Sequence, residues 1–244
     1  MCETCGCGDP GLVPVEVQEK ILSGNERQAA HNRAHFAEHG VLSINLMGSP
    51  GSGKTAVLEA TARGLSHRRL AALAGDLATE RDAERLTAAG IPCRAITTGS
   101  ACHLDADLVH RALHHLDLHA VDYLFVENVG NLVCPAVYDL GQACNVVALS
   151  VTEGEDKPLK YPVMFHRADL VLVTKIDLLP HLPEVRLEVI RENLARVMPE
   201  PLVLPLSART GLGITDWVAW LERERAHRHP SGVAAHGLAH QHGT

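Results

Sequence analysis

The chain has 244 residues, a formal net charge of −7 and only 3% aromatic residues. This length fits one α/β domain with short extensions, and 46% hydrophobic residues suffice for a core that needs no disulfides. The negative charge and the few aromatic rings argue against nucleic acid as a partner. Apolar runs are too short for a membrane span, and a basic-then-apolar signal pattern is absent, so we expect a cytoplasmic protein.

Apolar runs of strand length alternate with helical patterns along the chain. Residues 1–14 are rich in Cys and Gly, and a helical pattern then runs from Val15 to about His39. Strands are expected at Val41–Met47, Leu70–Gly75, Cys93–Thr97, Tyr123–Val126, Val146–Val151, Leu170–Thr174 and Leu202–Leu206. Further helices are expected at Lys54–His67, Thr79–Ala89, Asp105–Leu116, Glu184–Val197 and Ile214–Arg225. This alternation predicts a three-layer α/β fold with a mostly parallel central sheet.

We expect three parts along the chain. Residues 1–14 form a Cys-rich metal-binding motif, residues 15–226 form the α/β domain with its N-terminal helix, and residues 227–244 form a His-rich tail without regular structure.

The segment Gly48–Thr55 matches the pattern G-x-x-x-x-G-K-[ST] between a strand and a helix, which is the context of a phosphate-binding loop. Its glycines let backbone N–H groups point at phosphate oxygens, Lys54 neutralises the β- and γ-phosphates, and Thr55 offers a hydroxyl to Mg²⁺. The fold is therefore expected to be of the P-loop NTPase class; the alternative is a plain Gly-rich turn. The residues expected to bind nucleotide here are Gly48, Gly51, Ser52, Gly53, Lys54, Thr55 and Ala56.

A second motif, Thr174–Asp177, indicates that the base is guanine. The Asp177 carboxylate only accepts hydrogen bonds, so it matches the two donors on guanine's Watson–Crick edge and rejects adenine. Thr174, Lys175 and Asp177 are assigned to the base together with Ser207, Ala208 and Arg209, which follow a later strand. GTPases usually have Asn where this chain has Thr174, and the missing amide predicts a lower affinity.

Mg²⁺ and hydrolysis require carboxylates near the γ-phosphate. Asp76 and Glu127 follow expected strands, whose carboxyl ends are where ligands bind in such sheets. We assign Asp76 and Glu127 to Mg²⁺ together with Thr55, and Lys54, Asp76 and Glu127 to catalysis. The alternatives are a helix cap at Asp76 and a solvated strand end at Glu127.

Cys2, Cys5 and Cys7 form the pattern C-x-x-C-x-C. Clustered thiolates favour Zn²⁺, Ni²⁺ or Cu⁺. The alternatives are a redox pair and unstructured free thiols, but a redox pair normally begins a helix inside a folded domain. We therefore predict a metal site in this segment.

Cys102, His103 and Cys134 form a weaker second set. Both segments follow expected strands at the nucleotide end of the sheet, but the spacing alone leaves a metal site and an incidental arrangement open. Cys93 and Cys144 fall at or beside strands and are interpreted as small core residues. Four further histidines are expected on the polar side of one helix and are not interpreted as ligands: His110, His114, His115 and His119.

These motifs together resemble the HypB family of hydrogenase nickel-incorporation GTPases. The resemblance rests on the opening Met1–Gly8 segment, the P-loop, Cys102-His103, and the long motifs at residues 127–135 and 150–162. It covers residues 1 to about 225. It implies that Cys2, Cys5 and Cys7 bind Ni²⁺ tightly. It also implies that Cys102, His103 and Cys134 form a second Ni²⁺/Zn²⁺ site at a homodimer interface promoted by GTP.

The resemblance further implies GTP hydrolysis to GDP and phosphate, a HypA-type nickel accessory protein as partner, and the hydrogenase large subunit as recipient. We expect nucleotide-gated metal transfer, with slow intrinsic hydrolysis because no arginine finger is evident in the sequence. The rival functions are a small-molecule P-loop kinase and a metal store with a vestigial nucleotide site. Related proteins that have a His-rich stretch carry it near the N-terminus. The resemblance therefore does not imply a storage role for the C-terminal histidines of this chain.

Overall fold

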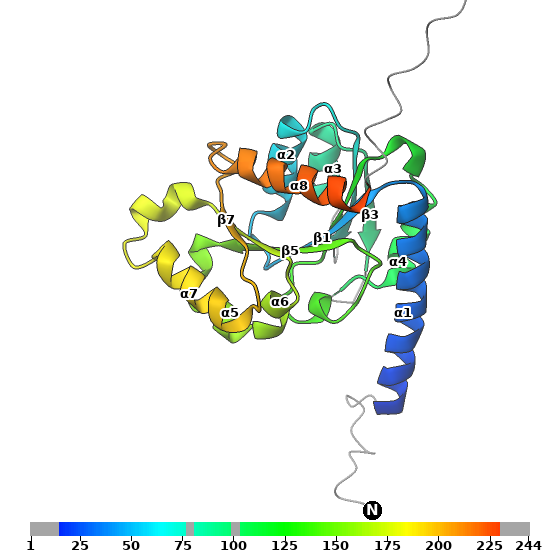
Figure 1. Cartoon of the computed structure of the whole chain (residues 1–244), viewed down its shortest axis with the longest axis horizontal. Coiled ribbons are helices and arrows are strands. Elements are labelled where there is room, and N and C mark those ends of the chain that lie inside the picture. Colours follow the sequence, from blue (N-terminus) through cyan, green and yellow to red (C-terminus); the bar gives the residue numbers. More distant parts are fainter. Residues whose placement is uncertain (1–14, 77–80, 99–102, 230–244) are drawn as a thin grey trace, which may run out of the picture.

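The computed structural model describes residues 15–76, 81–98 and 103–229, which form one sheet with helices on both faces (Figure 1). Cys2, Cys5, Cys7 and Cys102 lie outside these residues, as do residues 230–244 of the expected His-rich tail.

Seven strands of the described chain form a single sheet in which every neighbouring pair is parallel. In spatial order these are β3 (Cys93–Thr97), β2 (Leu70–Asp76), β4 (Tyr123–Glu127), β1 (Leu42–Met47), β5 (Cys144–Ser150), β6 (Leu170–Thr174) and β7 (Val203–Pro205). The parallel sheet predicted from the sequence is confirmed. Because all strands point the same way, the loops that follow them gather at one edge, and the predicted nucleotide residues lie there.

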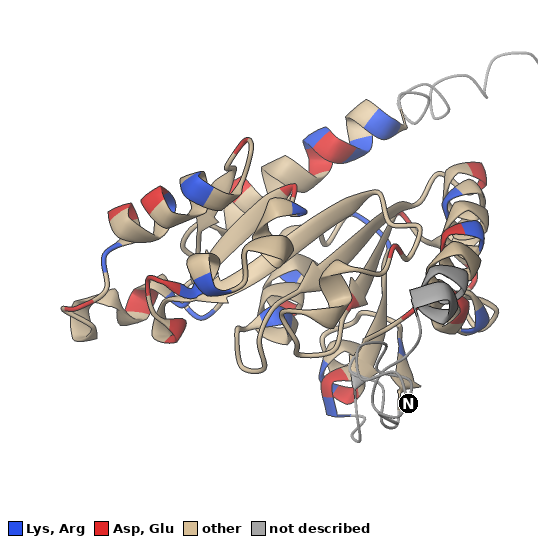
Figure 2. Ribbon diagram, turned by 90° about the horizontal axis from the view of Figure 1, so that it is seen from below, with Lys and Arg blue, Asp and Glu red and all other residues tan. Residues whose placement is uncertain are grey.

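Helices cover both faces of the sheet (Figure 1). One face carries α2 (Lys54–Gly64), α3 (Arg81–Ala88) and α8 (Ile214–Arg228). The other carries α1 (Val15–Glu38), α4 (Ala106–Leu113), α5 (Lys157–Lys160), α6 (Pro162–His166) and α7 (Leu187–Val197). Charged residues lie mainly on these helices and on the loops (Figure 2), as expected for a sheet buried on both sides.

The middle strand β1 positions the P-loop, and all six of its residues are buried. Leu42, Ile44 and Leu46 pack into the core beneath α2 and α8, in agreement with the two-residue period of a strand. On the opposite face, Ala29, Asn32 and Phe36 of α1 are buried at helical spacing. A rigid strand therefore presents the loop that follows it.

Asn32 holds α1 against the domain. Its buried Nδ2 donates to the carbonyl oxygen of Ala106 at 2.8 Å and to that of Leu140 at 3.1 Å. These two bonds join α1 to the start of α4 and to the loop before β5. The relative position of α1 and α4 is therefore determined by buried polar contacts as well as by apolar packing.

Several helix ends differ by one to three residues from the sequence prediction, and two of these differences change where histidines lie. Helix α4 stops at Leu113, so His114 and His115 lie in the following turn and His119 lies in the 3-10 helix η1 (Leu118–Ala120). Asp117 caps η1 by accepting from the backbone N–H of His119, which explains the break. Helix α8 continues to Arg228, so His227, expected at the start of the tail, is helical. No helix among the described residues is long and apolar enough to cross a bilayer.

Candidate nucleotide and metal site

The P-loop folds as a tight turn between β1 and α2. A Cβ atom on Gly48 would overlap the carbonyl oxygen of Ala148, so only glycine fits there. Gly53 has φ 96° and no side chain caps the helix that it precedes. The N-terminus of this eleven-residue helix is thus left to an external acceptor, which is the arrangement that suits a phosphate.

The side chain of Lys54 folds back onto the P-loop. Its Nζ donates to the carbonyl oxygens of Gly48 and Ser49, both at 3.2 Å, and its side chain is buried. A buried ammonium held by neutral carbonyls is suited to a stronger anionic partner such as a phosphate.

Thr55 and two carboxylates form the polar base of the pocket. The Thr55 hydroxyl lies 2.8 Å from Oε1 of Glu127 and 3.0 Å from Oδ1 of Asp82. Oε2 of Glu127 is buried without a hydrogen-bond partner, and burial raises the pKa of this carboxyl to about 7 against the opposing effect of the Thr55 hydrogen bond. Hard oxygen donors with one unpartnered oxygen fit a Mg²⁺ ion.

Asp76, the other predicted carboxylate, ends β2 and pairs in register with Thr97 of β3. Its side chain is outside the described atoms. Asp82 was not among the carboxylates assigned from the sequence. It lies in the first turn of α3, and the only sequence signal was the density of acids after β2.

A cavity of about 420 Å³ opens above these groups. It is lined by P-loop residues, by Asp82 and Glu127, and by Val129 and Gly130 from the loop after β4. Arg85 of α3 also lines it, held at 3.0 Å from Glu59 and 3.4 Å from Asp82. No arginine for the phosphates was evident from the sequence, and the structure places Arg85 at this cavity.

A second cavity of about 270 Å³ adjoins the P-loop, between the start of α2 and the segments that follow β6 and β7. Its lining contains every residue predicted for the guanine: Thr174, Lys175, Asp177, Ser207, Ala208 and Arg209, together with Gly53 and Ala56. Oδ1 of Asp177 accepts the Ser207 hydroxyl hydrogen at 2.6 Å. Asp177 therefore brings an acceptor-only carboxylate to the lining of this cavity, where it is bonded to Ser207.

Thr174 and Lys175 brace the P-loop from the side of β6. The Thr174 hydroxyl donates to the carbonyl oxygen of Ser52 at 2.6 Å, and Nζ of Lys175 donates to that of Gly51 at 2.6 Å. Lys175 has φ 58°, a left-handed conformation that is costly for a side chain of this size. The threonine that replaces the usual asparagine thus still bonds to the loop through its hydroxyl.

The loop after β4 packs directly on the P-loop. A Cβ on Gly130 would lie 2.8 Å from Cγ and 3.0 Å from N of Pro50, and Asn131 forms a β-bridge with Gly48. Four residues beyond Gly130 the chain reaches Cys134, in the 3-10 helix η2 (Cys134–Ala136). One short segment thus joins the phosphate pocket to a predicted metal ligand.

His103 lies on the same side, next to that segment. Its ring stacks on Tyr138 with centroids 3.9 Å apart, and the N–H of the adjacent Leu104 donates to Oδ1 of Asn128 at 3.4 Å. Burial lowers the pKa of His103, which favours the neutral, metal-binding imidazole. Within the described ranges, no three His, Cys, Asp or Glu side chains are already arranged around one metal position.

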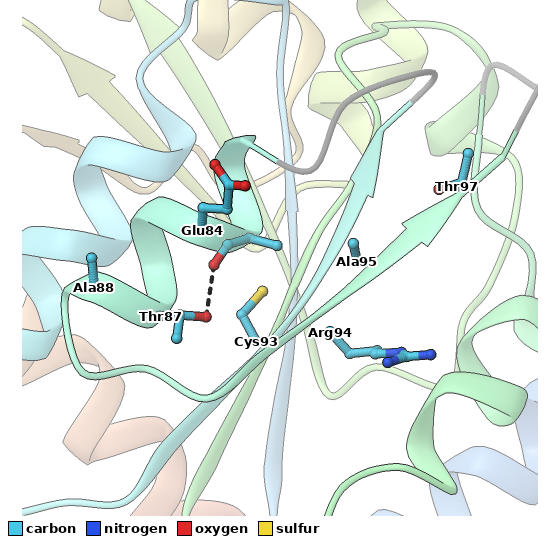
Figure 3. Close-up of a pocket in the computed structure, with 8 residues that line it drawn as sticks. Glu84, Thr87, Ala88, Cys93, Arg94, Ala95 and Thr97 are labelled. Atoms are coloured by element: carbon cyan, nitrogen blue, oxygen red, sulfur yellow. Dashed lines mark hydrogen bonds between the residues drawn. The ribbon is translucent and has the colours of Figure 1, made fainter.

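The structure also has a cavity of about 690 Å³ between α3 and the edge strand β3 (Figure 3). None of the predicted ligands lines it. Burial raises the pKa of the Cys93 thiol there to about 12, so this cysteine remains a protonated, partly buried core residue, as the sequence indicated.

The parallel sheet, with a glycine-rich loop between β1 and α2, defines a P-loop nucleotide-binding protein. The family model "CobW/HypB/UreG, nucleotide-binding domain" matches residues 42–204. The chain belongs to this family, in its HypB branch.

Curated relatives and solved structures support this assignment. The chain is 51% identical to "Hydrogenase maturation factor HypB" of Azotobacter chroococcum over 90% of this chain and 73% of that one. It is 46% identical to the protein of the same name from Escherichia coli K12, over 86% and 73%. The crystal structure of HypB from Helicobacter pylori in complex with nickel has a TM-score of 0.80 and 38% identity, covering 84% of this chain and 96% of that chain.

Proposed function

We propose that this protein binds and hydrolyses GTP, and that its nucleotide state controls delivery of Ni²⁺ to the large subunit of a nickel–iron hydrogenase in the cytoplasm. The names of the relatives support the maturation role, and the nickel complex of the Helicobacter pylori protein supports the metal. Residues 15–226 act as the GTPase domain, residues 1–14 as the first nickel-binding motif, and residues 227–244 as a separate His-rich tail.

The P-loop residues and the base pocket hold GTP. Lys54 neutralises the β- and γ-phosphates, and Asp177 accepts the two guanine donors once Ser207 releases it. Thr55, Asp76 and Glu127 hold Mg²⁺, with Asp82 as an additional acid, and the ion supplies positive charge next to the phosphate oxygens. These residues orient GTP for attack by water, which gives GDP and phosphate.

The observation that carries the gating proposal is the continuous segment from Glu127 to Cys134. Glu127 shares the Thr55 hydroxyl, Gly130 packs on Pro50, and Cys134 follows four residues later. A γ-phosphate in the cavity that Val129 and Gly130 line would press on this segment. The position of the segment therefore depends on which nucleotide is bound. Cys134, the metal ligand at its end, is ordered or displaced together with it.

The cargo is bound in two places. Cys2, Cys5 and Cys7 form the first site, and Cys102, His103 and Cys134 form a second site for Ni²⁺ or Zn²⁺ that two subunits complete in the GTP state. Val133 and Val137, on either side of Cys134, are 56% and 41% exposed. Exposed valines around a metal ligand suit a homodimer contact better than a solvent-facing loop. A HypA-type protein and the hydrogenase large subunit act as metal partners.

Titration of Ni²⁺ and Zn²⁺ into the nucleotide-free, GDP-bound and GTP-analogue-bound protein, with mass measured in parallel, tests the gating. We expect the GTP analogue alone to produce a dimer and to change the metal affinity, and Lys54→Ala to abolish both effects. Unchanged mass and unchanged affinity in all three states would refute the gating.

Two further measurements, of metal delivery and of the products of GTP turnover, separate the two rival functions. A metal store with a vestigial nucleotide site would deliver metal equally well after Lys54→Ala. A small-molecule kinase would transfer the γ-phosphate to an acceptor, and GTP would then yield a phosphorylated product in place of inorganic phosphate.

A further inference from the structure

Helices α1 and α4 bring two rows of histidines face to face, away from the nucleotide pocket. His31 and His35 lie on α1, and His39 follows the last residue of that helix, so the three are spaced four residues apart. His110 lies on α4 and His114 is its C-terminal cap, again four residues apart. Residues i and i+4 lie on the same side of a helix, with Cβ atoms about 5–6 Å apart. Each helix therefore presents a pair of imidazoles suited to binding one ion together.

The rings of the two rows are in contact. The centroids of His31 and His110 are 4.9 Å apart, and those of His110 and His114 are 4.8 Å apart. His35 lies beside His31, with centroids 6.3 Å apart. Two imidazoles bound to one ion at about 2.0 Å have centroids about 4.5 Å apart at a right angle and about 5.2 Å apart at the tetrahedral angle. The spacings of His31–His110 and of His110–His114 both fall within this range.

The ring nitrogens are in a suitable chemical state. Nδ1 of His35 and Nδ1 of His110 are buried and have no hydrogen-bond partner. Burial lowers the pKa of His35, with a further contribution from His39, and burial lowers the pKa of His110, with a further contribution from His114. Both rings are thus neutral near pH 7, with a lone pair to donate. Glu38 and Asp107 lie close enough to act on these rings and supply negative charge.

The backbone that carries the rings is held in place. Asn32, next to His31, bonds to the carbonyl oxygen of Ala106 at the start of α4. The two helices cannot slide past each other without breaking this buried bond, so the pairs remain opposed. The contacts are edge-to-face, at 73° and 76°. Among the described residues no three such side chains are arranged to hold a metal ion, so binding would require these rings to rearrange.

We propose that His31, His110 and His114 bind one divalent transition-metal ion between α1 and α4, with His35 as an adjacent fourth imidazole. Imidazole suits Ni²⁺, Zn²⁺ and Cu²⁺ and excludes Mg²⁺. The site is separate from the thiolate-containing sites of the proposed function, and it differs from them by using nitrogen donors alone. The sequence assigned His110 and His114 to a polar helix face because it could not show that α1 places His31 against them.

Histidine modification of the full-length, nucleotide-free protein by diethyl pyrocarbonate, read by peptide mass spectrometry, tests the site with Ni²⁺ or Zn²⁺ alone as the probe. Metal binding occupies the nitrogen lone pair that the reagent attacks. We expect the metal to slow modification of His31, His110 and His114 by roughly tenfold. The exposed His166 and His181 should be modified at an unchanged rate.

Two variants give the proposal its control. His110→Gln should remove the protection of His31 and His114, whereas His115→Gln, which changes an exposed neighbour outside the rows, should leave it intact. Urea unfolding of both variants verifies that they fold. Protection that survives His110→Gln, is equally lost in His115→Gln, or rises with protein concentration would overturn the site. The readout follows ring nitrogens without nucleotide, so its failure would leave the gating by GTP standing.

Discussion

At the residue scale, Glu127 is both a proposed Mg²⁺ ligand and a buried carboxyl whose negative charge is costly. The fold places it beside Thr55, and the same burial penalises its negative charge, so its pKa rises to about 7. Without Mg²⁺ and nucleotide this charge is poorly compensated, since one of its oxygens has no partner. The pocket is therefore electrostatically costly until a cation enters it, as is common for functional sites.

Replacing Glu127 by Gln should make the Mg²⁺-free, nucleotide-free protein more stable, by an amount that increases with pH. The folded-state pKa lies above the unfolded value, so the penalty is absent below about pH 4.5 and complete above about pH 7. We expect the gain in unfolding free energy to be about 1 kcal/mol at pH 5 and about 3 kcal/mol at pH 8. Urea unfolding at both pH values measures it.

The exposed Glu200→Gln is the matched control and should show no such trend. A gain from Glu127→Gln that is the same at pH 5 and pH 8 would mean that this carboxyl titrates normally. The variant should also lose Mg²⁺-dependent GTP binding, because an amide is a much weaker cation ligand than a carboxylate.

At the scale of elements, the loop from Glu127 to Cys134 is the connection between the two sites. It touches the P-loop at Gly130 and Asn131, and it touches the segment of His103 through Asn128. These contacts join chain segments that follow different strands. The loop can therefore transmit a displacement only while its packing on Pro50 is tight.

Gly130→Ala should loosen that connection. The added Cβ would lie 2.8 Å from Cγ and 3.0 Å from N of Pro50, and a backbone atom cannot move aside cheaply. We expect GTP-analogue affinity to fall by roughly tenfold, equivalent to about 1.4 kcal/mol, and the effect of the nucleotide on metal affinity to disappear. Fluorescent nucleotide binding and metal titration provide the two measurements.

Gly24→Ala is the control for this substitution. Gly24 lies in α1 with no atom within 4 Å of an added Cβ, so binding should be unchanged. If the nucleotide changed the metal affinity of Gly130→Ala as much as that of the wild type, the contact with Pro50 would not transmit the nucleotide state.

At the scale of the whole molecule, the proposed dimer depends on the surface around Cys134. Val133→Asp would place a charge at the centre of that contact, where an unpaired carboxylate is costly. We expect the variant to bind the GTP analogue normally and to remain a monomer by light scattering. Val163→Asp changes a valine of nearly equal exposure, 55% against 56%, on α6 and should dimerise normally. If the Val133→Asp variant still dimerised, the interface would not lie around Cys134.

Much of the fold was predictable from the sequence because its signals are local. A strand buried on both faces appears as a continuous apolar run, so all seven strands lay within two residues of their predicted bounds. The glycines and Lys54 of the P-loop stand next to one another in the chain and could be assigned together. Helix ends were harder: α4 ends at Leu113 because Asp117 caps a new turn, a choice that periodicity does not reveal.

What the tertiary structure alone decided is which distant side chains meet. Asp82 reaches Thr55 because α3 packs beside α2, and Arg85 reaches the phosphate cavity for the same reason. His31 meets His110 because α1 packs on α4, with Asn32 bonded between them. Such contacts depend on the packing of whole elements, which is set by burial over the entire core, so no local pattern contains them. The sequence by itself determined the P-loop class and the parallel sheet, and packing decided the second acid, the arginine and the paired histidines.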